Sequence, residues 1–328
     1  MQSMLKGARV RGEPLETAVA VTFSRPGGVL NSMYYHFLFD GALMFFLWRR
    51  HVWGADRPLE VLLPLDARFA AHFAALFPDV RVRSVDTSLW RGPSRQRVPG
   101  AHGSRGAPGS TGSGRPVGPP PPPPDPLPAG VASVRLPTVG ASWGPFPACF
   151  EDAVQMFRSD VLARAGAVAC GAPSGPRALT FVERRPFAVS GAPCPHAAVM
   201  QHGAGRRHIA NAEDVRALLR DAAPALGLGY EDPELEVLQI LDQAALFARS
   251  WIVVAQHGSA LGNVLWMPRG AWVIELGPPG PLCSFQALAE ACRVKWASCS
   301  VPGPDTGGLT VALPELQSQL QACAEDLS

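Results

Sequence analysis

The sequence predicts an α/β protein built on doubly wound parallel sheets. Short apolar segments with strand-like composition alternate with segments of helical period along most of the 328 residues, which is the pattern of βαβ units. The clearest strand, from Trp251 to Ala255, is a continuous apolar run rich in β-branched residues, as expected for a parallel strand covered on both faces. Hydrophobic residues make up 47% of the chain, which is enough for buried cores, and the length suits two domains.

The N-terminal half is expected to contain three strands and two helices. The strands are predicted at residues 17–23, 59–64 and 80–82, and the helices at 31–48 and 67–77. Gly, Pro, Ser and Arg then dominate residues 91–129, and Pro119 to Pro124 is an uninterrupted proline run. Such a stretch cannot bury enough apolar surface to offset its ordering entropy, so we predict a disordered insertion at 91–129 inside the N-terminal domain.

The C-terminal half continues the alternation of helices and strands. Helices are predicted at residues 150–166, 212–222, 234–248, 285–291 and 313–324, and strands at 177–184, 251–255, 272–276 and 294–296. Asn211 directly precedes one of these helices and is a favourable N-cap residue. We therefore divide the chain into an N-terminal domain at 15–150 and a C-terminal domain at 151–328.

A polar turn follows the clearest strand and leads into a short helix. Gln256 to Ser259 are small or polar, and the apolar residues after them recur at helical spacing. A turn of this kind, at the carboxyl end of a parallel strand and at a helix N-terminus, is where α/β proteins bind anions. Gly258 would let the backbone approach a ligand, and His257 and Ser259 add hydrogen-bond donors. Glu275 ends the next strand, where a carboxylate can hold ribose hydroxyls.

His36 and Asp40 lie one helical turn apart in the helix expected at 31–48. Residues four apart share one face of an α-helix, so their side chains are neighbours. The residues alone leave two interpretations open, a solvated surface pair beside a packed aromatic face and a pair of active-site groups.

Composition and charge exclude some classes of function. The formal charge is +2 and no basic cluster is interleaved with aromatic residues, so we expect no nucleic-acid partner. The seven cysteines show no zinc-ligand spacing, and four of them lie between Cys283 and Cys323, where a disulfide is possible but cannot be assigned.

No signal peptide is visible in the first residues, and a strand is already predicted soon after them. We therefore expect that a targeting segment or membrane anchor precedes this chain.

Three segments match known motifs in the same order along the chain. His257 to Leu276 has the sequence H-G-S-A-L-G-N-V-L-W-M-P-R-G-A-W-V-I-E-L. This block resembles H-G-A-G-L-T-N-x-L-F-L-P-x-x-A-x-V-x-E-L of glycosyltransferase family 61. Asn31 to Asp40 resembles the family segments N-M-Y-H-H-F-C-D and N-x-x-H-x-x-H-D, and Arg206 to Asn211 resembles R-x-I-L-N. The family includes the EGF-domain O-linked N-acetylglucosaminyltransferase, the O-mannose β-1,4-N-acetylglucosaminyltransferase and plant β-1,2-xylosyltransferases.

The resemblance implies a GT-B architecture, in which two Rossmann-like domains face a cleft. It implies inverting transfer of a sugar (N-acetylglucosamine, xylose or arabinose) from a UDP-sugar to a hydroxyl of a glycan or glycoprotein. The expected compartment is the lumen of the Golgi or endoplasmic reticulum. No D-x-D motif occurs in the sequence, so we expect no metal and no other cofactor; helix N-termini, arginines and histidines would meet the leaving-group charge.

The resemblance also assigns roles to individual residues. His36 and Asp40 become candidates for the general base on the acceptor side, beside Asn31. The C-terminal domain would bind the donor through a larger set, namely Arg184, Arg207, Asn211, Gln243, His257, Gly258, Ser259, Asn263 and Glu275. For Arg184 and Arg207, which would face the phosphates, the alternative is that two arginines near a strand end are simply solvated.

Departures from the family pattern keep a second hypothesis open. Ala260 and Gly262 stand where Gly and Thr or Ser are usual, so a catalytically inactive member that binds nucleotide or glycan is the alternative. A serine hydrolase using Ser259 is a poor rival, because its nucleophile elbow requires G-x-S-x-G, and His257 and Leu261 occupy the glycine positions.

Overall fold

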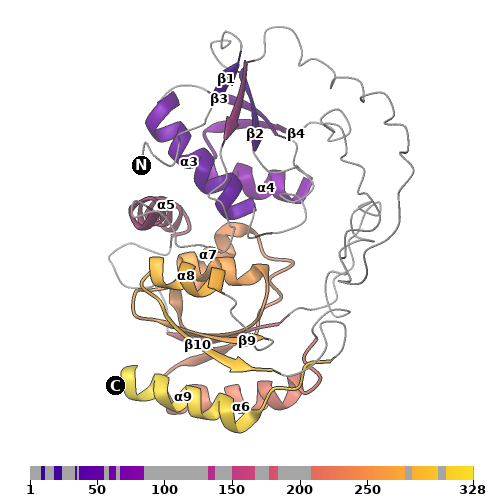
Figure 1. The fold of residues 1–328 in the computed structure, drawn as a ribbon, viewed down its shortest axis with the longest axis vertical. Helices are drawn as coiled ribbons and strands as arrows, with labels where there is room; N and C mark the ends of the chain where they lie inside the picture. Colours follow the sequence, from indigo (N-terminus) through magenta and orange to yellow (C-terminus); the bar gives the residue numbers. More distant parts are fainter. Residues whose placement is uncertain are drawn as a thin grey trace, which may run out of the picture.

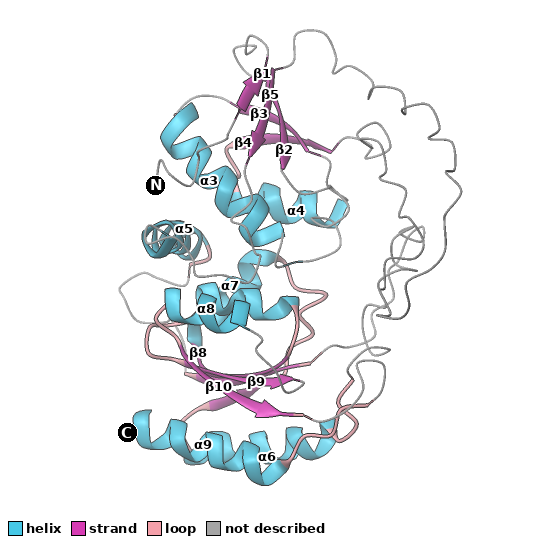
Figure 2. Ribbon diagram, viewed as in Figure 1, coloured by secondary structure: helices cyan, strands magenta, loops and turns pink. Residues whose placement is uncertain are grey.

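The computed structural model describes residues 9–11, 18–23, 34, 37–54, 59–63, 67–84, 132–136, 150–166, 177–183, 208–277, 283–301 and 308–327. These residues form two five-stranded sheets. Figures 1 and 2 show the sheets at different levels of the molecule, with helices between them and a further layer of helices beyond the second sheet. The chain is therefore a mixed α/β protein with largely parallel sheets, as the sequence predicts.

The first sheet has the strand order β1-β5-β2-β3-β4. Its strands are β1 (Arg9–Arg11), β2 (Ala18–Phe23), β3 (Leu59–Leu63), β4 (Val80–Ser84) and β5 (Ala132–Leu136). Only β1 runs antiparallel, paired to β5 at the edge. The chain moves from β2 to β3 and β4 on one side and returns to β5 on the other, which is the strand order of half a Rossmann fold.

The helical segment between β2 and β3 has π-helical geometry over much of its length. It comprises η1 (Phe37–Leu43), α3 (Met44–Trp48) and η2 (Arg49–Trp53), and η1 and η2 are π-helices. Every residue of η1 and α3 is buried, as expected for a helix that is apolar on all sides. The segment continues past the predicted end at residue 48 to Gly54, which has a positive φ of 104°. The predicted helix α4 (Ala67–Leu76) packs beside it.

The second sheet is entirely parallel and has the order β10-β9-β8-β6-β7. Its strands are β6 (Ala178–Val182), β7 (Gly229–Glu231), β8 (Ser250–Gln256), β9 (Trp272–Gly277) and β10 (Lys295–Ser300). The chain leaves β6 toward β7 and then returns to β8 on the other side of β6. The strand order thus reverses between β6 and β8, and in open α/β sheets this is the topological switch point where ligands bind.

Helices cover both faces of the second sheet, as Figure 1 shows. The face toward the first sheet is covered by α7 (Ile240–Arg249), the 3₁₀ helix η4 (Ser259–Trp266) and α8 (Cys283–Ala291). The opposite face is covered by α6 (Ala212–Ala225) and α9 (Leu313–Leu327). Strand β8 serves both layers, because Val253 belongs to the first apolar cluster and Ile252 and Val254 belong to the second.

One apolar cluster joins the helices of the first sheet to those of the second. The ring of Phe157, in α5 (Phe150–Arg164), lies 6.5 Å from Phe77 and 5.7 Å from Trp266. Arg164 donates from the same helix to the backbone carbonyl of Leu76. The predicted domain boundary at residue 150 stays a prediction, and α5 packs against both halves.

Several details differ from the sequence expectation. Strands β1, β5 and β7 were not predicted, because three to five residues give too little alternation to recognise. Residues 235–237 form a turn and α7 begins at Ile240, later than predicted. The cysteines Cys292, Cys299 and Cys323 are buried free thiols; the remaining four have no described side chain. The Pro/Gly-rich segment 91–129 lies outside the described residues.

Candidate functional site

The carboxyl edge of the second sheet brings together the ends of β6, β8 and β9. His257 follows β8 directly, and its backbone N–H donates to the carbonyl of Leu276 in β9, 2.8 Å away. Glu275 lies beside Ala255 in the register of the two strands. The turn predicted to bind an anion therefore lies at the carboxyl edge, beside the topological switch point.

His257 and Glu275 form a buried pair at this edge. Nδ1 of the imidazole is hydrogen-bonded to Oε1 of the carboxylate, and the side chains of His257 and Glu275 are 11% and 4% exposed. Phe285 of α8 meets the imidazole edge-on at a centroid distance of 5.4 Å. These contacts fix the ring, and Nε2 is the nitrogen that remains to face a ligand.

This pair changes the expectation for Glu275. The sequence predicted a carboxylate available to ribose hydroxyls, but one of its oxygens is committed to His257. A ribose contact through the other oxygen stays a prediction.

The turn after His257 opens into the N-terminus of η4, which starts at Ser259. Gly258 has an extended backbone that any residue can adopt, so its conformation does not require glycine. The N-cap position is Gly258, which has no side chain to cap this helix N-terminus. Its first backbone N–H groups are of the kind that bind phosphate, and Ser259 is partly exposed beside them.

Asn263 and Gln243 lie in a buried polar network. Nδ2 of Asn263 donates to Oε1 of Gln243 over 3.0 Å, and Nε2 of Gln243 donates to the carbonyls of Leu235 and Leu238, both at 3.1 Å. Both side chains are at most 2% exposed. These hydrogen bonds occupy the amides within the protein, so the geometry favours a supporting role over the predicted contact with the donor.

Asp40 is fully buried within the π-helix η1. This finding excludes the surface-pair interpretation for this residue, because a carboxylate is rarely buried without polar partners or a function. Hydrogen bonds in a π-helix span five residues, so the i, i+4 geometry of an α-helix does not hold within η1. His36 and Asn31 lie outside the described residues, and their placement beside Asp40 stays a prediction.

The other predicted donor residues divide into two groups. Arg184 and Arg207 lie outside the described residues. Asn211 is described, but its side chain does not cap α6 as predicted. Instead, its amide donates to the carbonyl of Val311 over 3.0 Å and accepts the N–H of Val311 over 2.9 Å, so it ties the start of α6 to the chain before α9.

A family model now decides the identity of this fold. The model described as Glycosyltransferase 61 matches residues 34–274, which include Tyr34, Asp40 and the His257 turn. The chain belongs to glycosyltransferase family 61. A search of curated proteins finds no match.

Sequence reasoning missed an ion network at the carboxyl edge of the second sheet of this glycosyltransferase. Arg216, in α6, binds Glu183, Glu213 and Asp232. Burial lowers the pKa of Arg216, but the hydrogen bond to Asp232 and the nearby carboxylates outweigh this effect and raise the pKa. Glu183 directly follows β6 and Asp232 directly follows β7, so Arg216 links the carboxyl ends of two strands. No local sequence pattern brings these residues together, so only the three-dimensional structure reveals this cluster.

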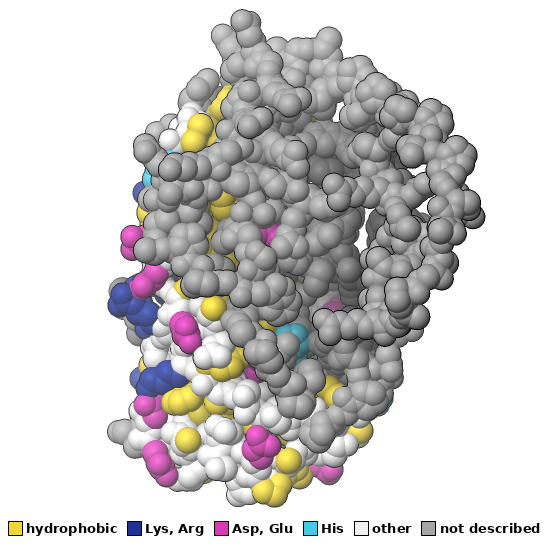
Figure 3. Space-filling model, viewed as in Figure 1, with side chains coloured by type: hydrophobic (Ala, Val, Ile, Leu, Met, Phe, Trp, Pro, Cys, Tyr) yellow, Lys and Arg dark blue, Asp and Glu magenta, His cyan; other side chains and the backbone are white. Residues whose placement is uncertain are grey.

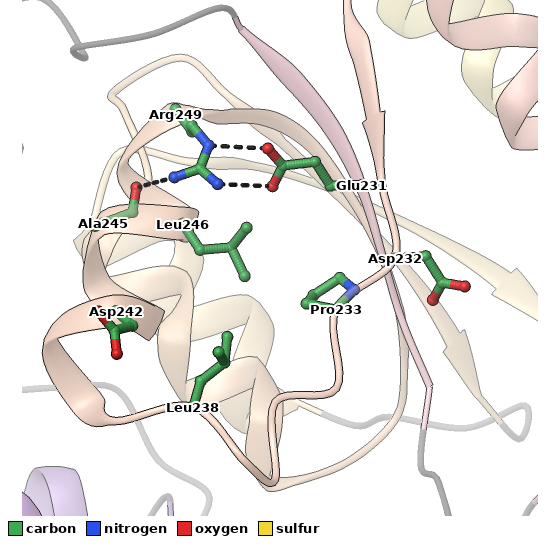
Figure 4. Close-up of a pocket in the computed structure, with 8 residues that line it drawn as sticks. All are labelled: Glu231, Asp232, Pro233, Leu238, Asp242, Ala245, Leu246 and Arg249. Carbon is green, nitrogen blue, oxygen red and sulfur yellow. Dashed lines mark hydrogen bonds and ion pairs between the residues drawn. The ribbon is translucent and has the colours of Figure 1, made fainter.

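A surface pocket of about 460 Å³ lies at the edge of the second sheet, between the end of β7 and α7 (Figure 4). Arg249 reaches across to Glu231 with two hydrogen bonds of 2.9 and 3.1 Å. The apolar side chains of Leu238, Leu246 and Pro233 also line the pocket. None of the predicted donor residues lines this pocket, so we do not assign it to the sugar donor.

The described surface and helices complete the comparison with the sequence. On the face drawn in Figure 3, basic and acidic side chains alternate along the edge of the C-terminal half. Among the described residues, no three histidine, cysteine, aspartate or glutamate side chains are grouped to hold a metal ion. The described helices include none with the length and apolarity to span a membrane. The prediction that no metal is required stays a prediction.

Proposed function

We propose that this glycosyltransferase moves a sugar from a UDP-sugar to a hydroxyl of a glycan or glycoprotein, with inversion at the anomeric carbon. The main support is the buried His257–Glu275 pair, which directly precedes the N-terminus of η4 at the switch-point edge of a parallel sheet. This arrangement combines a positioned imidazole with backbone N–H groups, and both suit a diphosphate.

In this proposal the diphosphate binds the turn after β8. Nε2 of His257, the hydroxyl of Ser259 and the first N–H groups of η4 meet its oxygens, and Arg184 and Arg207 add positive charge. The bond between the anomeric carbon and the diphosphate oxygen breaks, and UDP leaves with the bonding electrons. Hydrogen bonds to the charge that develops on this oxygen lower the barrier without a metal ion.

The acceptor hydroxyl attacks from the side of the N-terminal half. We propose a GT-B arrangement in which the segment of Asn31, His36 and Asp40 faces the donor edge. The acceptor oxygen forms the new bond to the anomeric carbon and gives its proton to a general base. The full burial of Asp40 favours a role in which it orients His36, which would then accept the proton.

The expected sugar is N-acetylglucosamine, xylose or arabinose, and the expected compartment is the lumen of the Golgi or endoplasmic reticulum. The alternative is an inactive family member that binds nucleotide or glycan. It is supported by Ala260 and Gly262 in η4, where the family pattern has Gly and a hydroxyl residue.

A binding and turnover assay tests the proposal. We expect UDP, and one of UDP-N-acetylglucosamine, UDP-xylose and UDP-arabinose, to raise the melting temperature of the full chain. A ligand at one hundred times its Kd stabilises by about 2.7 kcal/mol. Release of UDP from the stabilising donor separates an active transferase from a binding protein. If no nucleotide stabilises the chain, the proposal is wrong.

A further inference from the structure

Tyr34 forms a hydrogen bond between two parts of the chain that are 229 residues apart in sequence. Its hydroxyl donates to Oδ1 of Asn263 over 2.9 Å, and the same oxygen accepts the indole N–H of Trp266 over 3.1 Å. The Tyr34 ring lies 6.4 Å from the rings of both Phe37 and His72, so it is also held from its own side. The hydroxyl thus joins the N-terminal helical segment to η4.

The hydrogen bonds continue from Asn263 into the segment before α7. Asn263 donates to Gln243, which in turn donates to two backbone carbonyls. Tyr34, Asn263, Trp266 and Gln243 therefore form one connected set, which we call the Tyr34 network. Its members come from three separate elements, and three of the four are at most 2% exposed.

The surroundings of the Tyr34 network are apolar. Trp266 and the neighbouring Phe37 belong to the apolar cluster that joins the two halves, and Tyr34 packs against it. Apolar contacts are non-directional, so they hold surfaces together without fixing one register. A buried hydrogen bond is directional, and any other register would leave polar atoms without partners in an apolar environment. The Tyr34 network therefore fixes how the N-terminal segment sits on η4.

This register matters because each end of the network adjoins a part of the proposed site. Tyr34 shortly precedes η1, the π-helix that contains Asp40, and Asn263 lies in η4, which begins directly after the His257 turn. We propose that Tyr34 is a positioning residue that sets the acceptor-side segment against the donor turn. This inference rests on the proposed function, in which those two parts act on one sugar.

The test uses Tyr34→Phe in the full chain, which keeps the aromatic ring and removes only the hydroxyl. Tyr230→Phe, on β7 of the second sheet, is the matched control. UDP affinity is measured by calorimetry, and turnover is measured as UDP release from the stabilising UDP-sugar with water as acceptor. Both are measured at a temperature at which near-ultraviolet circular dichroism shows each variant to be folded.

We expect Tyr34→Phe to keep the Kd for UDP within about twofold, because the donor turn is intact, and to lower kcat by about tenfold or more with little change in donor KM. Misplacement of reacting groups by about 1 Å can reduce rates by up to about 10². Tyr230→Phe should leave both quantities unchanged.

Unchanged kcat in folded Tyr34→Phe would show that the hydroxyl is only structural and would overturn the inference. A loss of UDP affinity as large as the loss of turnover would also overturn it, because the residue would then act on donor binding. If the wild-type chain neither binds UDP nor releases UDP from a UDP-sugar, the proposed function itself is wrong. This failure is seen in the wild type, whereas failure of the inference is seen only in the Tyr34→Phe variant.

Discussion

His257 is hydrogen-bonded through Nδ1 to Oε1 of Glu275. This bond couples two residues that the sequence analysis assigned to different parts of the donor. The sequence suggested that His257 serves the diphosphate and Glu275 the ribose. In the structure the carboxylate holds the imidazole, so the effects of the two side chains on nucleotide binding should be coupled.

The coupling predicts strongly non-additive effects on UDP affinity. Loss of a hydrogen bond to a charged group is worth about 1.5–3 kcal/mol, so His257→Ala should weaken UDP binding by at least about tenfold. Glu275→Ala should weaken it by a smaller factor, and Glu275→Gln, which retains a partner for Nδ1, by less still. Calorimetry on the double variant should give the same Kd as His257→Ala alone. If the two losses add, Glu275 contacts the nucleotide independently.

Gln243 should matter for stability more than for donor binding. Gln243→Leu leaves the Asn263 amide and the Leu235 and Leu238 carbonyls without their partner. Unsatisfied buried groups cost about 1–3 kcal/mol each, and two of the three bonds are fully buried, so we expect urea unfolding to show a loss of about 2–6 kcal/mol. Gln286→Leu, at an exposed site on α8, is the control and should change stability little. Normal stability with lost UDP affinity would restore the predicted donor contact.

Arg216 should stabilise the carboxyl ends of β6 and β7. Arg216→Met removes the guanidinium that binds the half-buried carboxylates of Glu183 and Asp232, and we expect a loss of about 2–3 kcal/mol in the free energy of unfolding. Arg220→Met, an exposed arginine of the same helix that lies over Tyr230, is the control and should lose less than about 1 kcal/mol. Equal losses in urea unfolding would contradict a specific role for the Arg216 network.

The three buried thiols predict a loss of stability at alkaline pH. Burial raises the pKa values of Cys292, Cys299 and Cys323 to about 12. An unfolded thiol loses its proton near its ordinary pKa of about 8.5. Between these values the unfolded state binds fewer protons, so the free energy of unfolding falls as pH rises, and the contribution is complete only below about pH 8.

Urea unfolding at two pH values measures this effect for one thiol. Between pH 7.5 and 9.5 each buried thiol should contribute a loss of about 1.4 kcal/mol. Cys323→Ala should therefore lose about that much less than wild type over this interval, although its cavity lowers stability at both pH values. Ser318→Ala, at an exposed position of α9, should retain the wild-type pH dependence. Identical slopes for all three proteins would show that Cys323 is not a protonated buried thiol.

Long apolar runs made much of the fold predictable. The run from Trp251 to Ala255 and the amphipathic period of α5 indicated a buried strand and a helix directly. Strands such as β7, with three residues, are defined by pairing with distant neighbours, and no local pattern shows that pairing. The strand orders, and with them the switch point between β6 and β8, were likewise not in the sequence pattern.

The position of the His257 turn in the fold was predictable, but its internal contacts were not. The turn at His257 was found because its polar residues interrupt two apolar strands. The bond from His257 to Glu275 depends on the register of β8 and β9, which the sequence leaves open. Asn263 and Gln243 were assigned to the donor by resemblance. Only the structure reveals that their amides are buried and bind each other.

The central claim is that the turn after β8 binds the diphosphate of a nucleotide sugar, and the affinities for UDP and UMP test it most directly. Calorimetry on the full chain should show that UDP binds more tightly than UMP, because the second phosphate meets His257 and the N-terminus of η4. His257→Ala should reduce the UDP-to-UMP affinity ratio by about tenfold, whereas His51→Ala, at an exposed histidine of η2, should leave it unchanged. A folded His257→Ala variant that keeps the full wild-type ratio would contradict the account and would place the diphosphate elsewhere.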